Sequence, residues 1–255
     1  MYKADQFRVR SLEDILADLS EASHLPFPYR RLFIADGDAL VMPAAALIAI
    51  FDAARQAFPQ LERIGIYASP KSVQTKTDDE LKQLKSKGLD IAYLGLESGD
   101  EQILRDVNKG ATAEEILVAG QRLKAAGMLV SVTLISGLGG QDRLAEHALH
   151  SARILSQMEP DYLGLLTLHL NEQTPIYSRV QSGALKLLTP EQVLEELELL
   201  VSNLQVSNLV FRSNHASNYW VLAGQLPQDR DRLLEEIKLA RTGLIQSRSE
   251  WMRSL

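Results

Sequence analysis

Apolar runs alternate with amphipathic stretches along the chain, and the two patterns predict strands and helices in turn. The segment SLEDILADLS carries apolar side chains at the spacing of one helix face. RRLFIADGDAL then predicts a short strand that ends in a glycine turn, and MPAAALIAIFDAARQAF predicts an apolar helix with Pro43 in its first turn. RIGIYASP predicts the next strand, which Pro70 ends. The chain therefore begins as helix, strand, helix and strand.

Helix start signals mark the next amphipathic segments. Thr77 with Glu80, and Thr112 with Glu115, have the spacing of capping boxes, and a glycine ends each of the two helices that they begin. A third signal of this kind opens the helical segment TPEQVLEELELLVSNL. The other segments predict strands over 89–99, 128–140, 161–170 and 208–212, and helices over 143–158 and 229–243.

The strands are continuous apolar runs rather than alternating ones, as expected for parallel strands that are buried on both faces. A helix separates each strand from the next, which is the pattern of right-handed βαβ units. About five or six such units form either a doubly wound sheet or a curved, barrel-like sheet. In both folds, functional residues gather where the strands end.

Composition narrows the function classes. The formal net charge is −6 and the basic residues form no cluster, which argues against a DNA-binding face. No apolar run of about 18 residues and no signal-peptide pattern occurs, so we expect a cytoplasmic protein with no membrane partner. The chain contains no cysteine, which excludes disulfides and any thiolate-bound metal or cluster within it.

The strand ends supply the candidate chemistry. The candidate segments are 37–40, 69–70, 97–99, 136–140 and 169–174. Three of them are glycine turns, which let backbone N–H groups approach a ligand closely. Each turn alone is explained equally well as a tight connection without a ligand. Together on one face they favour a ligand such as a nucleotide.

Glu97 is the most informative single residue, because it ends an apolar strand at the mouth of the sheet. A carboxylate there can accept hydrogen bonds from two ribose hydroxyls. The alternative is that Glu97 caps the following helix.

The histidines are weaker candidates. We expect His147 and His150 at a helix surface, whereas His169 ends a strand and is a candidate substrate contact. His215 and Asn214 either bind substrate or tie down a turn near the C-terminus. No pair of histidines has metal-site spacing, and no nucleotide-binding Walker loop or hydrolase serine motif occurs.

Two adjoining blocks identify a family. LDIAYLGLESGDEQILRDVNKGAT, followed by AAGMLVSVTLISGLGG, closely resembles the fourth and fifth strands of the radical S-adenosylmethionine enzymes. DGDAL stands where those enzymes carry a glycine-rich turn, and FRSNHASNYWVLAGQLPQDRDRLLEEI resembles the C-terminal part of a bacterial branch. The resemblance covers nearly the whole chain and implies an α/β fold, a partial (β/α)6 TIM-like barrel of parallel strands.

The resemblance also implies cofactors and their contacts. The family uses a [4Fe–4S] cluster and S-adenosylmethionine, which is cleaved reductively to a 5′-deoxyadenosyl radical. By resemblance, the methionine amino group meets Gly37, Asp38 and Ala39, its carboxylate meets Lys109, the ribose meets Glu97, Ser69 and Thr133, and the adenine lies near Gly137 and Leu168.

The resemblance further implies a missing N-terminal part. In the branch concerned, MYK…FR follows directly on the last cysteine of a C-x3-C-x2-C loop between the first strand and the first helix. We therefore expect this chain to lack the first strand and the three cluster ligands, and to be an inactive, truncated piece. We expect residues 1–186 to form the partial barrel and residues 187–255 to form a helical extension packed on it.

Two functions follow from these observations. The first is a radical enzyme core that acts on a small-molecule or unknown substrate and takes its electron from a donor in the full-length enzyme. The second takes the missing cysteines at face value and makes the chain a cluster-less module that binds a nucleoside or a partner. A Schiff-base lyase is disfavoured, because no lysine ends a predicted strand.

Overall fold

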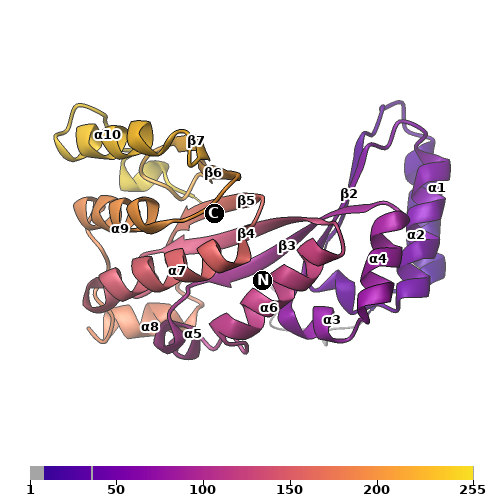
Figure 1. Cartoon of the computed structure of the whole chain (residues 1–255), viewed down its shortest axis with the longest axis horizontal. Helices are drawn as coiled ribbons and strands as arrows, with labels where there is room; N and C mark the ends of the chain where they lie inside the picture. The colour runs from indigo at the N-terminus through magenta and orange to yellow at the C-terminus, as the bar shows by residue number, and fades with distance from the viewer. Residues whose placement is uncertain (1–8, 36, 255) are drawn as a thin grey trace. The chain divides into compact units, whose positions relative to one another are not determined.

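The computed structural model describes residues 9–35 and 37–254 as alternating helices and strands (Figure 1). Their contacts divide the chain into two compact units. The first unit takes in the described residues of Met1–Tyr93 and Arg122–Leu129, and the second takes in those of Leu94–Gln121 and Val130–Leu255.

The first unit begins with two helices that pack together, α1 and α2, and a parallel pair of strands, β1 and β2. The register of the strand pair runs from Arg31 opposite Arg63 to Ile34 opposite Ile66. The elements of this unit are α1 (Leu12–Ser23), β1 (Arg31–Ile34), α2 (Ala44–Ala57), β2 (Arg63–Ala68), α3 (Pro70–Gln74), α4 (Asp78–Ser86) and the first part of β3 (Leu89–Glu97).

The second unit continues from β3 and contains the remaining strands. Strands β4, β5 and β6 pair in parallel, and β7 pairs with β6 in the antiparallel sense. Helix α9 lies beside α7, and α10 packs on α9 and β7 (Figure 1). Most of α6 (Ala113–Ala125) and of β4 (Leu129–Ser136) belongs to this unit, while the segment Arg122–Leu129 belongs to the first. The other elements are α5 (Glu101–Asp106), α7 (Leu144–Met158), β5 (Tyr162–Thr167), α8 (Pro175–Gln181), α9 (Pro190–Asn203), β6 (Leu209–Ser213), β7 (Leu222–Leu226) and α10 (Arg230–Arg241).

The described strands form one mostly parallel sheet in the order β1 to β7. The sheet is open, because its first and last strands are not neighbours, and this confirms the predicted partial barrel. The additional strand β7, which the sequence did not predict, runs antiparallel to β6. The connection 214–221 holds no crossover helix, and a parallel return needs a connection of about a dozen residues or more.

The local start signals are confirmed at the hydrogen-bond level. Thr77 and Glu80 form a reciprocal capping box at α4, and Thr189 forms one at α9. Thr112 and Glu115 exchange the same pair of bonds at the start of α6. The short helices α3, α5 and α8 were not predicted, because one or two turns carry too little periodicity to stand out.

The C-terminal region contains both helices and strands. Residues 187–255 contribute two strands, β6 and β7, as well as α9 and α10. The short strand expected over 208–212 is confirmed as β6, whereas β7 was not predicted. The boundary at residue 186 stays a prediction.

Gly99 generates a stability prediction, because a side chain there has no room. A Cβ at Gly99 would lie 2.4 Å from the carbonyl oxygen of His150, which is backbone of α7. Gly99→Ala should therefore lower the free energy of unfolding by about 1 to 3 kcal/mol in urea denaturation. Gly164→Ala is the matched control, because the nearest atom to its Cβ would be the Val132 oxygen at 3.9 Å. Equal effects of the two substitutions would contradict the packing argument.

Candidate functional site

In the first unit, the turn after β1 carries a partly satisfied carboxylate. Gly37 has a φ of 79°, in the left-handed region that glycine adopts without strain. Asp38 follows, and its Oδ2 accepts a hydrogen bond from the hydroxyl of Ser69. Its Oδ1 is buried and has no hydrogen-bond partner among the described residues. An oxygen of this kind is an acceptor that calls for a cationic or N–H donor.

Ser69 is already engaged within the protein. Its hydroxyl accepts from the Ser72 backbone N–H as the N-cap of α3, and the Ser72 hydroxyl completes the capping box. Lys76 supplies the positive charge near Asp38. Burial lowers the pKa of Lys76, while the charges of Glu80 and Asp38 raise it. Ala39 is buried at the start of a short 3-10 turn, Ala39–Val41.

A cavity of about 460 Å³ adjoins this turn. Asp38 and Ala39 lie on its wall, which is otherwise made mainly of apolar side chains of α1, β1 and α2. An unpaired carboxylate oxygen costs more free energy beside such surroundings than in water. The turn after β1 is therefore suited to receive a cation.

In the second unit, Glu97 ends β3 with a backbone φ of 61°. The left-handed region is unfavourable for a glutamate and persists where surrounding contacts hold it. Its Oε1 accepts from the Lys109 ammonium at 2.9 Å, and both side chains are partly buried. Gly95 makes room for this pair, because a Cβ there would lie 2.2 Å from Oε1 of Glu97 and 2.9 Å from Nζ of Lys109.

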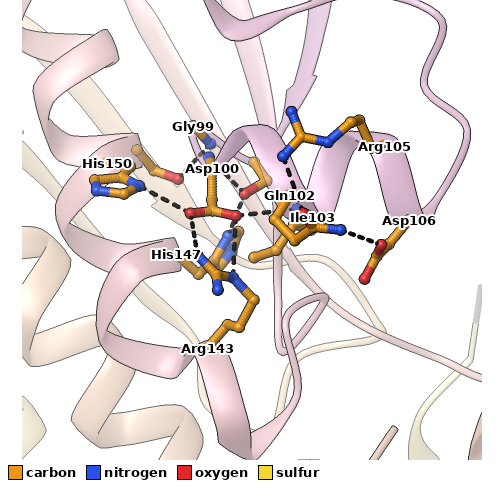
Figure 2. A network of polar contacts seen from close by, with 11 residues as sticks. Gly99, Asp100, Gln102, Ile103, Arg105, Asp106, Arg143, His147 and His150 are labelled. Carbon is orange, nitrogen blue, oxygen red and sulfur yellow. Dashed lines mark hydrogen bonds and ion pairs between the residues drawn. The ribbon is translucent and has the colours of Figure 1, made fainter. Parts of the chain in front are cut away.

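Asp100, and not Glu97, caps the following helix. The Asp100 carboxylate accepts from the Ile103 N–H at 3.0 Å, from Arg143 at 2.8 and 3.1 Å, and from Nδ1 of His150 at 2.9 Å (Figure 2). Its side chain is 3% exposed. Burial raises the pKa of Asp100, but the hydrogen bonds from Arg143, Ile103 and His150 outweigh it and hold the pKa at about 2. The alternative role of Glu97 as a helix cap is therefore wrong.

Both His147 and His150 were expected at the surface of a helix. This prediction is wrong for His147 and confirmed for His150. His147 is 1% exposed and its Nδ1 lies 2.7 Å from the hydroxyl of Ser98, whereas His150 is half-exposed (Figure 2). Gly99 approaches the same helix, and its N–H donates to the Ser151 hydroxyl at 2.8 Å. The close approach at Gly99 buries His147 against the turn after β3.

The ends of β4 and β5 lie on one cavity of about 350 Å³ in the second unit. Gly137, Leu168 and His169 line it, together with Tyr219 and Arg253. Leu168 donates its N–H to the Ser136 oxygen and accepts from Arg253 through its own oxygen, each at 2.9 Å. Thr133 lies further back on β4, in register with Gly164 of β5.

The weak substrate candidates occupy different places. Nδ1 of His169 is buried without a hydrogen-bond partner among the described residues. Asn214 is exposed, and Nδ1 of His215 bonds to Ser217 in its own turn. Asn218 is buried and bonds to Thr167 at the end of β5. His169 is the one of the three predicted substrate contacts that lines the cavity.

Sequence reasoning missed two buried charged residues near these turns. Glu196 of α9 accepts from the Gly137 N–H, and the buried Arg253 contacts Leu168 and the Tyr219 ring. A signal for Glu196 was present, because it interrupts an apolar stripe of α9, whose buried members include Val193, Leu197 and Leu200. Nothing in the local sequence pattern indicated Arg253, because its hydrogen-bond partner Leu168 lies far away in the sequence.

The structure brings several predicted residues together. In the first unit Asp38 contacts Ser69, and in the second Glu97 contacts Lys109 while Gly137, Leu168 and His169 line one cavity. Within 9–35 and 37–254, no group of three or more potential ligands is placed to hold a metal ion. In the same residues no helix has both the length and the apolar character needed to cross a bilayer.

An open, mostly parallel sheet with charged pairs and glycine turns where its strands end defines an α/β protein of the partial-barrel class. The sequence model of the Radical SAM superfamily matches residues 2–151, more than half of the chain. The chain therefore belongs to the radical SAM superfamily, which confirms the resemblance carried by its β3 and β4 blocks.

Solved structures support the same fold. Coproporphyrinogen III oxidase (HemN) from Escherichia coli superposes with a TM-score of 0.58 at 19% identity, over 75% of this chain and 45% of that chain. Elp3 from Methanocaldococcus infernus gives a TM-score of 0.57 at 18% identity, over 92% of this chain and 60% of that chain.

The curated relatives are longer proteins. The heme chaperone HemW of Bacillus subtilis is 21% identical over 203 residues, which cover 75% of this chain and 53% of that protein. HemW of Lactococcus lactis is 23% identical over 205 residues, with the same coverage. The chain thus spans about half the length of the curated relatives it matches.

The superfamily binds S-adenosylmethionine and a [4Fe–4S] cluster, and the second of these does not fit this chain. Iron–sulfur clusters are held by cysteine thiolates, and the sequence contains none. The cluster is therefore not bindable by this chain.

Asp100 generates a prediction for acid stability. Its pKa is about 2 in the folded chain against an ordinary value of 3.8, so its stabilising contribution is complete above about pH 4 and is lost as the pH falls toward about 2. Asp100→Asn should lower the free energy of unfolding at neutral pH and flatten its dependence on pH across that window, measured by urea denaturation at a series of pH values. Asp142→Asn, at an exposed position, should keep the wild-type pH dependence. An unchanged acid limb in Asp100→Asn would contradict the argument.

Proposed function

We propose that this chain is the S-adenosylmethionine-binding part of a radical SAM protein. The observation that carries the proposal is the Glu97–Lys109 ion pair at the end of β3. The backbone of Glu97 lies in the left-handed region, and Gly95 leaves the space that the two side chains occupy. Strain of this kind costs about 1 to 3 kcal/mol and clusters at binding and active sites. A structural role as a helix cap does not account for it, because Asp100 has that role.

The first unit offers the contacts for the amino acid end of the ligand. The methionine ammonium is a donor, and Oδ1 of Asp38 is a buried acceptor without a partner among the described residues. Gly37 and Ala39 flank it with backbone groups, and Gly37 adopts the positive φ that allows close approach. Ser69 holds the carboxylate of Asp38 through its other oxygen and is a candidate sugar contact.

The second unit offers the contacts for the nucleoside and the carboxylate. Glu97 is proposed to accept hydrogen bonds from the ribose hydroxyls, and Thr133 adds a polar contact to the sugar. Lys109 is proposed to bind the methionine carboxylate with its ammonium group. Gly137 and Leu168 are proposed to flank the adenine, and both line the second unit's cavity.

S-adenosylmethionine supplies a 5′-deoxyadenosyl radical when radical SAM enzymes cleave it reductively. This chain alone is proposed to bind the molecule without cleaving it, since it has no thiolate for the cluster. The electron for such a cleavage is proposed to come from a donor that acts on the full-length enzyme. The substrate is proposed to be a small molecule that His169 contacts, with Asn214 and His215 as weaker candidates.

A second candidate function rests on the cysteine count itself. The chain without thiolates is proposed, in this case, to be a nucleoside-binding or interaction module that performs no cluster chemistry. Binding of S-adenosylmethionine is common to the first function and to the nucleoside-binding form of the second. A chain that binds neither S-adenosylmethionine nor S-adenosylhomocysteine would be left with the interaction role alone.

Calorimetric titration with S-adenosylmethionine tests the proposal. Glu97→Ala should weaken binding by about 1 to 3 kcal/mol, because buried hydrogen bonds to the ribose are lost. Glu114→Ala is the matched control, since Glu114 is exposed at the start of α6 and should leave the affinity unchanged. Absence of binding to the wild-type chain would overturn the proposed function. Binding that is unaffected by Glu97→Ala would overturn the role of Glu97.

Reconstitution tests the statement about the cluster. Incubation of the chain with iron, sulfide and a reductant should give no cluster absorbance and no 5′-deoxyadenosine from S-adenosylmethionine, because no thiolate is available. The matched positive control is a radical SAM enzyme that contains its three cysteines. Formation of 5′-deoxyadenosine by this chain alone would show that the statement is wrong.

A further inference from the structure

Two buried polar side chains of the second unit, His147 and Glu196, belong to none of the proposed ligand contacts. They are 1% and 3% exposed. Oε2 of Glu196 accepts from the Ser136 hydroxyl at 2.5 Å and from the Gly137 N–H at 2.9 Å. Each side chain also has one buried atom without a hydrogen-bond partner among the described residues, Nε2 in His147 and Oε1 in Glu196. Buried polar atoms are normally paired, so both require an explanation.

The hydrogen bonds at Ser98 favour one tautomer of His147. The Ser98 hydroxyl accepts from the Asp100 N–H at 3.0 Å and lies 2.7 Å from Nδ1 of His147. Its single hydrogen is used in a hydrogen bond only if it points at Nδ1, and this favours Nδ1 as the acceptor and the proton on Nε2. Nε2 is accordingly a donor without a partner, and Oε1 of Glu196 is an acceptor without one.

The ionisation of Glu196 depends on its surroundings, which include His147. Burial raises the pKa of Glu196, whereas His147 and the hydrogen bonds from Ser136 and Gly137 lower it. The helices that carry them, α7 and α9, lie side by side (Figure 1). A donor and an acceptor that are both buried, both unpaired and electrostatically coupled are complementary.

We propose that His147 and Glu196 are positioning residues, in which Nε2–H of His147 donates to a water molecule that in turn donates to Oε1 of Glu196. The resulting series of hydrogen bonds runs from Ser98 through His147 and Glu196 to Gly137. It joins the turn that follows Glu97 at the end of β3 to the turn after β4. That these turns bind S-adenosylmethionine rests on the proposed function, but the chain of bonds itself does not.

This arrangement explains how the strained turn is maintained. Glu97 adopts an unfavourable backbone conformation, so its neighbours must hold it. Ser98 is fully buried, and its hydroxyl is bound on both sides, by Asp100 and by His147. A link from His147 to Glu196 extends that support to the Gly137 turn.

Nuclear magnetic resonance of the full chain tests the proposal. The wild-type His147 ring should show the nitrogen shifts of a neutral imidazole with its proton on Nε2. Glu196→Ala should accelerate exchange of the Gly137 amide about tenfold or more, because its acceptor is removed. Glu195→Ala is the matched control on the exposed face of the same helix and should change neither signal.

Glu196→Gln separates positioning from general stability. Glutamine keeps the volume and one carbonyl oxygen for Ser136 and Gly137, so Gly137 exchange should stay within about twofold of wild type. Its amide donor replaces an acceptor opposite Nε2–H, so the His147 ring signals should change. This variant also carries the test if Glu196→Ala does not fold.

The outcomes distinguish this inference from the proposed function. A proton on Nδ1 of His147 in the wild type, or Gly137 exchange in Glu196→Ala equal to that in Glu195→Ala, would overturn the positioning role. In calorimetry, Glu196→Ala should weaken S-adenosylmethionine binding about tenfold through the displaced turn. If the wild-type protein does not bind S-adenosylmethionine, the proposed function is overturned. The resonance data then still test whether the hydrogen bonds between His147 and Glu196 exist.

Discussion

The left-handed backbone of Glu97 is the constraint on which the polar structure of the second unit depends. An L-residue at a φ of 61° needs its neighbours to hold it, and here they do so from several sides. Lys109 pairs with the side chain, Gly95 leaves room for that pair, and Asp100 anchors the next helix to Arg143. The turn after β3 is thus fixed by ionic and steric contacts together, rather than by one of them.

Burial and partnership divide the polar groups of the chain into two kinds. Asp100 is buried and fully paired, so its charge contributes to stability. Asp38 and His169 each keep one buried polar atom without a partner among the described residues, and each adjoins a cavity. Asp100 therefore contributes to the fold, whereas the unpaired atoms of Asp38 and His169 remain acceptors or donors beside a cavity.

This chain belongs to the radical SAM superfamily but contains no cysteine, and the two facts bear on different parts of its chemistry. Binding of a nucleoside needs hydrogen-bond acceptors and backbone groups, which do not require a thiolate. Cluster chemistry needs thiolates, which the chain does not provide. The proposed binding of S-adenosylmethionine can therefore be examined separately from the redox chemistry of the superfamily.

The sequence by itself determined the elements and the family. Strand and helix periods, and the capping signals at Thr77, Thr112 and Thr189, are local properties, because each depends on residues within a few positions of one another. Gly37, Glu97 and Gly137 were placed at strand ends for the same reason. Strand β7 escaped prediction, because an antiparallel edge strand is defined by its partner and not by its own pattern.

Only the tertiary structure decided how polar side chains are used. His147 is buried because Gly99 lets the turn after β3 approach α7, and Glu196 reaches Gly137 because α9 packs beside α7. Arg253 contacts Leu168 from the far end of the chain. Hydrogen bonds between residues distant in sequence depend on how elements pack, and no local period records that packing.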